Sequence, residues 1–326
     1  MNSFGTLFRV SLFGESHGPA IGVSIDGIPA GIEFSEADME KDIARRKPGA
    51  QGTTPRVEAD SPEILSGVFN GRTTGAPMTI IFRNSNTRSG DYESLRSHPR
   101  PGHADFTAMK KYHGFNDYRG GGHFSGRVTL AIVAAGSIAK KITPLQEISS
   151  EILEIGGNKD YASILDEAVK NGDSLGGIIQ VKISGLPCGL GEPFFNSYES
   201  VLSHIIFSIP AVKGIEFGAG FSSSKMKGSE NNDLIISPDG KTATNNAGGI
   251  NGGITNGNEI IFRVAVKPTP SISQQQHTLN FSRGSTEPLE IRGRHDACIA
   301  IRTPVVFEAC AAIVSADMYL INKAYI

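Results

Sequence analysis

The stretch VSIDGIPAGI (Val23–Ile32) recurs later in the chain as VKISGLPCGL (Val181–Leu190), with five identities in ten positions. Each copy is typical of a strand that ends in a turn containing proline and glycine. A helical pattern follows each copy, at Glu36–Arg46 in the first case and at Ser197–Ser208 in the second. The repetition predicts two similar halves built from strands and helices. Chance similarity between common turn sequences is the alternative explanation.

Two more pairs of segments repeat in the same order. The strand-like segment TIIFRN, which ends at Asn84, resembles EIIFRV, which ends at Val264. A long alanine-rich apolar helix is then expected at Gly126–Lys141 and again at Ile301–Asn322. Because both helices are apolar almost all round, we expect them to lie between layers. The predicted fold is therefore α/β (α+β): a β-α-β sandwich with central helices between sheets and an internal pseudo-two-fold repeat.

The domain organisation follows from these repeats. We expect a single domain over residues 1–326, with halves at roughly 1–145 and 175–326. Residues 146–174 are expected to connect them and to carry one amphipathic helix near Tyr161–Lys170.

Composition narrows the classes of function. With 31 basic and 33 acidic residues the net charge is −2, so no overall charge favours nucleic acid or a membrane as partner. The three cysteines have no CxxC spacing, which argues against a cysteine zinc site and for a reducing compartment. Without a recognisable signal peptide or long apolar run, a cytoplasmic location is expected.

The segment GESHG (Gly14–Gly18) fits the G-x-S-x-G pattern of a serine-hydrolase nucleophile elbow. That elbow needs a strand before the serine and a helix directly after it. Here Gly18 and Pro19 follow, and then an alternating pattern begins at Ile21, which indicates strand, loop, strand. We therefore reject Ser16 as a nucleophile and ask what His17 does.

Chemically active side chains are concentrated in glycine-, proline- and asparagine-rich segments. Together they would supply several arginines and lysines around a few histidines, and guanidinium groups match phosphates and carboxylates. The alternative is that they are solvated loop charges. The segments are GESHG, ARRKPGAQG, RPGHADF, YRGGGHFSGR, TNNAGGINGG, and KPTPS with GRHDAC after it.

Three residues within these segments are candidates for proton transfer. His17 and His103 lie among loop residues that favour exposed, unusual backbone, where an imidazole can exchange protons near neutral pH. Asp296 follows Arg294 and His295 and is either a member of a surface ion pair or a base in an arginine-rich cleft. Metal-binding H-E-x-x-H, G-x-G-x-x-G and Walker A patterns do not occur in the sequence. Residue chemistry alone thus indicates an anion-binding enzyme with acid and base groups.

In order and spacing these segments closely resemble the chorismate synthase family. The resemblance rests on FGESHG, RPGHAD, RGGG, GLGEP, SIPAVKGIEFG, TNNAGGINGGITNG, KPTPS and GRHDAC, and runs from about Phe4 to Tyr319. It implies a carbon–oxygen lyase that makes chorismate from 5-enolpyruvylshikimate 3-phosphate by 1,4-anti elimination of phosphate, with loss of a C6 hydrogen. The family needs reduced FMN, shares the two-fold sandwich fold and is usually a homotetramer.

The resemblance also implies roles for individual residues. His17 matches the acid that protonates the departing phosphate, His103 the partner of the reduced flavin, and Asp296 the carboxylate that works with the flavin to remove the C6 proton. Arg46 matches a position associated with NADP, and the implied substrate-binding residues are Arg45, Arg119 and Arg127. The implied flavin contacts are His123, Phe124, Ser125, Pro210, Ala211, Gly252, Lys267, Pro268, Thr269, Pro270, Ser271 and Arg294.

The chain departs from the family pattern in two places. The family commonly reads RGGGRSSARET where this chain has RGGGHFSGRVT, so His123 and Phe124 replace an arginine and a serine. Gly52 stands where many members have a second NADP-associated arginine. No additional domain for flavin reduction is evident, so the reduced FMN is expected from a separate reductase, with NADPH involved only indirectly. A non-catalytic regulatory protein that binds a phosphosugar or nucleotide is the alternative function.

Overall fold

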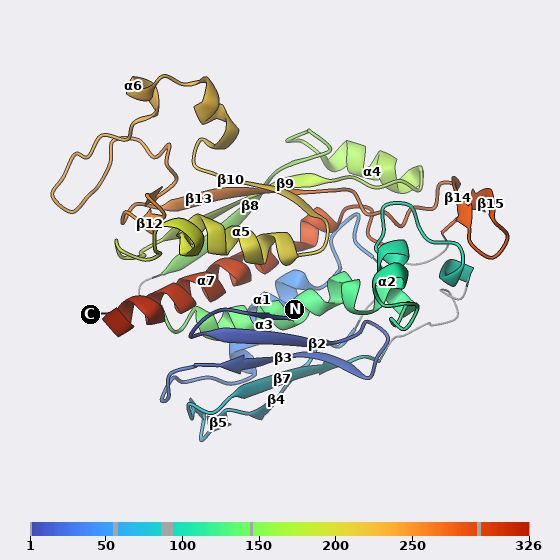
Figure 1. The fold of residues 1–326 in the computed structure, drawn as a ribbon, viewed down its shortest axis with the longest axis horizontal. Helices are drawn as coiled ribbons and strands as arrows, with labels where there is room; N and C mark the ends of the chain where they lie inside the picture. Colours follow the sequence, from blue (N-terminus) through green and yellow to red (C-terminus); the bar gives the residue numbers. More distant parts are fainter. Residues whose placement is uncertain (1, 55–57, 86–93, 144–145, 292–294, 326) are drawn as a thin grey trace.

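The computed structural model describes residues 2–325 except 55–57, 86–93, 144–145 and 292–294. Two antiparallel sheets enclose a layer of helices (Figure 1). The first sheet has the strand order β1-β2-β3-β7-β4 and the second the order β10-β13-β9-β8. Their strands are β1 Ser3–Phe4, β2 Arg9–Gly14, β3 Ala20–Asp26, β4 Pro62–Ser66, β7 Met78–Arg83, β8 Glu147–Ile155, β9 Gly177–Ser184, β10 Val212–Phe217 and β13 Ile260–Val266.

The helices and the short hairpins complete the described architecture. Three hairpins lie outside the two sheets: β5 Val68–Phe69 with β6 Arg72–Thr73, β11 Ile250–Asn251 with β12 Ile254–Thr255, and β14 Gln276–Asn280 with β15 Ser285–Leu289. The α-helices are α1 Ala37–Arg46, α2 Asp105–Lys111, α3 Thr129–Ala139, α4 Ala162–Lys170, α5 Tyr198–Ser208, α6 Gly228–Asn231 and α7 Pro304–Tyr325. Short 3₁₀ turns occupy Ser94–Arg96, Arg119–Phe124, Gly126–Val128, Phe194–Asn196, Gly220–Lys225 and Ile299–Arg302.

The two halves repeat one another strand by strand and helix by helix. The first runs β2, β3, α1, β4, β7, α3, and the second runs β8, β9, α5, β10, β13, α7, with the same neighbours in each sheet. The predicted sandwich and its internal repeat are therefore confirmed. The second repeat begins with β8, inside the segment 146–174 that we expected to be a connector, because the alternating residues of EISSEILEI pair along β9.

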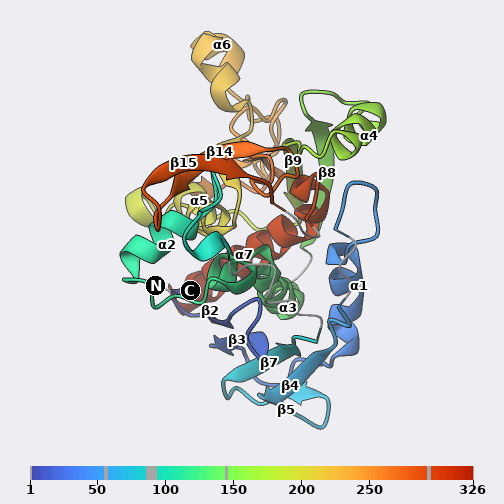
Figure 2. The same cartoon turned by 90° about the vertical axis from the view of Figure 1, so that its right-hand side faces the viewer.

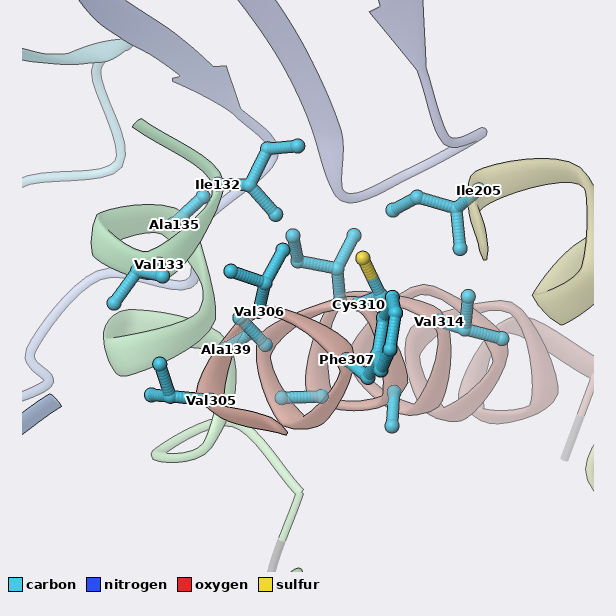
Figure 3. Close-up of a cluster of buried hydrophobic side chains, with 14 of the residues drawn as sticks. Ile132, Val133, Ala135, Ala139, Ile205, Val305, Val306, Phe307, Cys310 and Val314 are labelled. Atoms are coloured by element: carbon cyan, nitrogen blue, oxygen red, sulfur yellow. The ribbon is translucent and has the colours of Figure 1, made fainter. Parts of the chain in front are cut away.

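The central layer is formed by α3 and α7, which are apolar on nearly all faces. Every residue of α3 is buried, and so are residues Val305–Met318 of α7. Figure 3 shows their side chains interleaved, with Ile205 of α5 beside them. The two helices approach closely at Gly136, where an added Cβ would lie 2.4 Å from Cβ of Ala309. By length and a mean hydropathy of 1.6, α7 could cross a membrane, but 78% of that window is buried inside the fold, as in a core helix.

Long polar contacts join the helices to the rest of the chain. On α7, the buried Asp317 accepts hydrogen bonds from the backbone N–H groups of Thr6, Leu7 and Phe8 at 2.7–2.8 Å. Glu308 of the same helix receives two hydrogen bonds of 2.6 Å from Arg45 of α1. These bonds fix the N-terminal segment and α1 against the central layer.

Candidate active site

α2 and the β14–β15 hairpin lie at the same end of the sandwich (Figures 1 and 2). The loop that precedes α2 lines a cavity of about 820 Å³. Its wall combines segments from both halves, including the loop before α2, the glycine-rich turn at 119–124, the end of α5 and the segment before α7. Most of the predicted site residues line it: Arg46, His103, His123, Phe124, Ser125, Arg127, Pro210, Ala211, Lys267, Thr269, Pro270, Ser271 and Asp296.

His103 is held by a largely buried carboxylate. Its Nδ1 lies 2.6 Å from a carboxylate oxygen of Asp105. The two oxygens of this carboxylate also accept hydrogen bonds from Nε and Nη2 of Arg100, at 2.7 and 2.8 Å. Burial lowers the pKa of His103, while the hydrogen bond to Asp105 raises it and the charge of Arg100 lowers it. In the neutral ring Nδ1 donates to Asp105, so Nε2 is the proton acceptor. The Nε2 atom faces Gly121, where an added Cβ would lie 3.5 Å away.

The glycine-rich turn separates His17 from the cavity. Gly120, Gly121 and Gly122 all have positive φ, at 60°, 81° and 55°, which glycine adopts without the steric cost of a Cβ. A Cβ at Gly120 would lie 2.4 Å from Cδ2 of His17, so this glycine and the imidazole are in direct contact. Gly120 lines the cavity, whereas His17, only 8% exposed, lies behind it.

Ser16, next to His17, is 1% exposed and lies in a loop between β2 and β3, not before a helix. The expected order of strand, loop and strand is confirmed, and the nucleophile elbow is excluded.

Asp296 and Arg46 share one wall of the cavity with Arg302. Asp296 accepts a hydrogen bond from the backbone N–H of Thr54 at 2.9 Å, and Nη1 of Arg302 lies 3.2 Å from its other oxygen. Burial lowers the pKa of Arg46 to about 9, and the neighbouring Arg302 acts in the same direction. Arg46 nevertheless stays protonated at neutral pH. Its side chain donates to the carbonyl of Gly126 at 2.6 Å.

Arg127 is the most buried of the predicted substrate-binding residues. Its Nη1 lies 2.6 Å from Asp60 and its Nε donates to Asn84 at 2.7 Å. Its Nη2 is buried and has no hydrogen-bond partner among the residues that the structure describes. The same holds for the hydroxyl of Thr269 on the cavity wall. A buried guanidinium N–H and a buried hydroxyl of this kind can bind an anion or another polar ligand.

Several predicted site residues lie outside the described cavity wall. Arg45 is bound to Glu308, and Arg119 is bound to Asp117 at 2.7 and 2.8 Å on the turn. Gly252 lies in the β11–β12 hairpin, and Pro268 is the one member of KPTPS that does not line the cavity. Arg294 is outside the described residues.

The expectation that all the glycine-rich segments meet at one site stays a prediction, and the segment TNNAGGINGG does not contribute to the described cavity wall. None of the described residues 244–253 lines the cavity. Side chains of that segment instead complete its own turns: Asn245 donates to the carbonyl of Glu259 at 2.7 Å and accepts from the N–H of Gly249 at 2.8 Å.

Sequence reasoning missed other groups of the site. Asp105 follows His103 by two residues, so the RPGHAD segment itself held the signal for a histidine with an orienting carboxylate. Asp60 and Asn84 lie 67 and 43 residues from Arg127, and no local pattern connects them to it. His204 was also missed: it lines the cavity with its ring 5.4 Å from that of Phe4.

Comparisons with known proteins agree on one family. The chorismate synthase family model matches residues 8–320. A curated chorismate synthase from Chitinophaga pinensis is 60% identical over 324 residues, covering 99% of this chain and 98% of the relative. One from Dehalococcoides mccartyi is 47% identical, covering 98% and 96%. A crystal structure of chorismate synthase superposes with a TM-score of 0.73 at 28% identity, covering 97% of this chain and 92% of that one. The chain belongs to the chorismate synthase family.

Proposed function

We propose that this cavity catalyses the 1,4-anti elimination of phosphate from 5-enolpyruvylshikimate 3-phosphate, which gives chorismate, with reduced FMN as cofactor. The observation that carries the proposal is the combination, in one cavity, of fixed arginines with a histidine–carboxylate pair and a second carboxylate. Arginines alone would serve a binding protein, whereas an elimination also needs groups that hold and move protons. The regulatory alternative has no support, because the matched relatives are enzymes.

The residues present fit a flavin phosphate and a phosphorylated substrate. Lys267, Arg100 and Arg302 add positive charge to the wall formed by Arg46 and Arg127. The unpaired Nη2 of Arg127 and hydroxyl of Thr269 can each bind a ligand oxygen. We assign the cofactor to the wall made of 124–125, 210–211 and 267–271, since the ring nitrogens of His123 face Gly14 and Asn2, and the substrate phosphate to the side of Arg127. Reduced FMN, when bound, supplies electron density to the substrate as phosphate leaves.

The protein's own groups account for the proton movements. Asp296 is the proposed acceptor of the C6 proton, since its carboxylate is fixed by Thr54 and Arg302 at the cavity wall. His17 is the proposed donor to the departing phosphate, reaching it past Gly120, because glycine leaves no side chain between the imidazole and the cavity. His103, neutral and with Nε2 directed toward Gly121, is the proposed partner of the flavin.

Other features of the family are proposed for this chain as well. We infer a homotetramer, a cytoplasmic location, and a separate reductase that supplies reduced FMN at the expense of NADPH. Arg46 is buried, and its Nε and Nη2 donate to the hydroxyl of Thr129 and the carbonyl of Gly126. A direct contact with NADP would therefore have to use its other N–H groups. Residues 1–326 are proposed to act as one domain, since the hydrophobic core is shared by both halves.

The test is anaerobic incubation of the protein with reduced FMN and 5-enolpyruvylshikimate 3-phosphate. We expect phosphate and chorismate to appear in equal amounts, and neither to appear with oxidised FMN without reductant. Flavin binding is followed separately by the change in flavin absorbance. Folded protein that binds FMN and still releases no phosphate would contradict the proposed reaction.

A further inference from the structure

The imidazole of His123 lies beside a protein oxygen at each ring nitrogen. Its Nδ1 lies 2.8 Å from the carbonyl oxygen of Gly14, and its Nε2 lies 3.2 Å from Oδ1 of Asn2. A carbonyl can only accept, so Nδ1 carries the hydrogen. The side chain that stands in place of the common arginine of the family is therefore directed toward the N-terminal half, and its Nε2 is left as an acceptor beside the side-chain amide of Asn2.

A second bond joins the same two segments. The backbone N–H of Ser16 donates to the carbonyl of Gly122 at 3.1 Å. Gly14 and Ser16 belong to the loop that carries His17, and Gly122 and His123 belong to the glycine-rich turn. The turn thus binds the loop at two points close in sequence to the contact between Gly120 and His17.

We propose that His123 is a positioning residue, which docks the glycine-rich turn on the loop at residues 14–18 and thereby sets the place of the His17 imidazole behind Gly120. These two bonds hold the loop on the side of the turn, while Asn84 holds it by donating to the carbonyls of Glu15 and Gly18 at 3.0 and 2.8 Å. The bond between Ser16 and Gly122 uses backbone atoms only and does not depend on the side chain at position 123. The bond to the carbonyl of Gly14 requires a donor in that side chain. This role rests on the proposed acid function of His17.

Two substitutions separate this role from a general loss of structure. In His123→Asn the amide nitrogen takes the place of Nδ1 and can still donate to the carbonyl of Gly14. In His123→Gln the amide nitrogen takes the place of Nε2, so the bond to Gly14 is lost although size and polarity are kept. His123→Ala removes the donor altogether, and His277→Ala, on the exposed face of the β14–β15 hairpin, is the control.

We expect His123→Asn to keep kcat within about 3-fold of the unchanged protein and the Gln and Ala variants to lose between about 10- and 100-fold, the range for a misplaced catalytic group. KM and the Kd for FMN, measured by quenching of flavin fluorescence, should change by less than about 3-fold in all variants. Equal loss of kcat in the Asn and Gln variants, or a loss of FMN affinity that parallels the loss of kcat, would overturn the positioning role.

A readout that needs no turnover keeps this inference distinct from the proposed reaction. In protein labelled with ¹⁵N-histidine, the ring signals of His17 are assigned by their absence in His17→Gln. They should stay in place in His123→Asn and move or broaden in His123→Gln and His123→Ala. Unmoved His17 signals in all three variants would refute the docking role, even in a protein that lacks the elimination activity.

Discussion

Nδ1 of His103 and a carboxylate oxygen of Asp105 lie 2.6 Å apart in a largely buried corner of the cavity wall. The pKa of Asp105 is held well below its usual range by hydrogen bonds from Arg100 and His103, although burial alone would raise it. The carboxylate therefore stays ionised at any pH at which the enzyme would work. It fixes the tautomer of a histidine whose own pKa is lowered by burial.

Asp105→Asn removes the charge that favours protonated His103. The pKa of His103 should then fall further, so its neutral form persists to lower pH. If neutral His103 is the active form, the rising limb of kcat against pH should move to lower pH. The plateau should fall by about 10-fold because the ring is held less firmly. The measurement is kcat from pH 5 to 9, with the exposed Asp26→Asn as control. A limb that stays in place or moves to higher pH would contradict this assignment.

Arg127→Lys keeps the positive charge but loses the planar fork that contacts Asp60 and Asn84. We expect KM for the phosphorylated substrate to rise by about 10-fold or more, with kcat within about 3-fold. Lysine is preferred to alanine, since removing the cation leaves buried Asp60 uncompensated at a cost of about 3–5 kcal/mol. The matched control is Arg83→Lys, whose arginine forms two bonds with Glu63 on the exposed edge of the first sheet. Equal effects of both substitutions would argue against substrate binding by Arg127.

Asp296→Asn retains the shape of the side chain and an oxygen that can accept from Thr54, but it is a far weaker proton acceptor. We expect kcat to fall by about 10² to 10⁴-fold. KM should stay the same or improve slightly, because a negative charge leaves an anion-binding cavity. Anaerobic stopped-flow measurements with substrate and reduced FMN distinguish the two parameters. Near-normal kcat with weakened binding would show that Asp296 only balances the charge of Arg302.

Gly136→Ala tests the contact between the two central helices. Alanine suits a helix better than glycine, but its Cβ would lie 2.4 Å from Cβ and 2.6 Å from Cα of Ala309. We therefore expect a net loss of about 1–3 kcal/mol in the free energy of unfolding, measured with urea.

Adding Ala309→Gly should restore part of that loss, because it removes the Cβ that is in the way. The control is Gly228→Ala in α6, where an added Cβ meets no atom within 4 Å. A Gly136→Ala protein as stable as the unchanged one would mean that α3 and α7 can move apart at low cost.

The repeated segments allowed much of the fold to be predicted. The match between Val23–Ile32 and Val181–Leu190 located β3 and β9, which occupy equivalent places in the two sheets. The absence of a polar face on α3 and α7 indicated their place between the layers. β8 was not predicted because its sequence does not resemble that of any segment in the first half. Its place as a strand becomes evident only from its pairing with β9.

The candidate site was less predictable. Local composition predicts that a segment is a loop, but it does not predict on which side of the sheet that loop lies. Arg45 and Arg46 are adjacent in sequence, yet successive residues of a helix point about 100° apart. Arg46 shares the buried face of Met39 and Ile43 and reaches the cavity, while Arg45 turns to Glu308. The partners of Arg127 were also hidden, since they come from distant parts of the chain.

The close contact of α3 with α7 limits how this protein can admit its ligands. The two halves share one hydrophobic core and are in close contact where Gly136 meets Ala309. A hinge motion that separated them would therefore expose the whole central layer to solvent. Entry and release must then depend on the loops around the cavity mouth, such as those flanking α2 and the β14–β15 hairpin. We expect backbone amides of α3 and α7 to exchange with deuterium most slowly and those loops to exchange fast, becoming protected when cofactor and substrate bind. Ligand exchange in such a molecule is then expected to follow the motion of these loops, while the central helices keep their places.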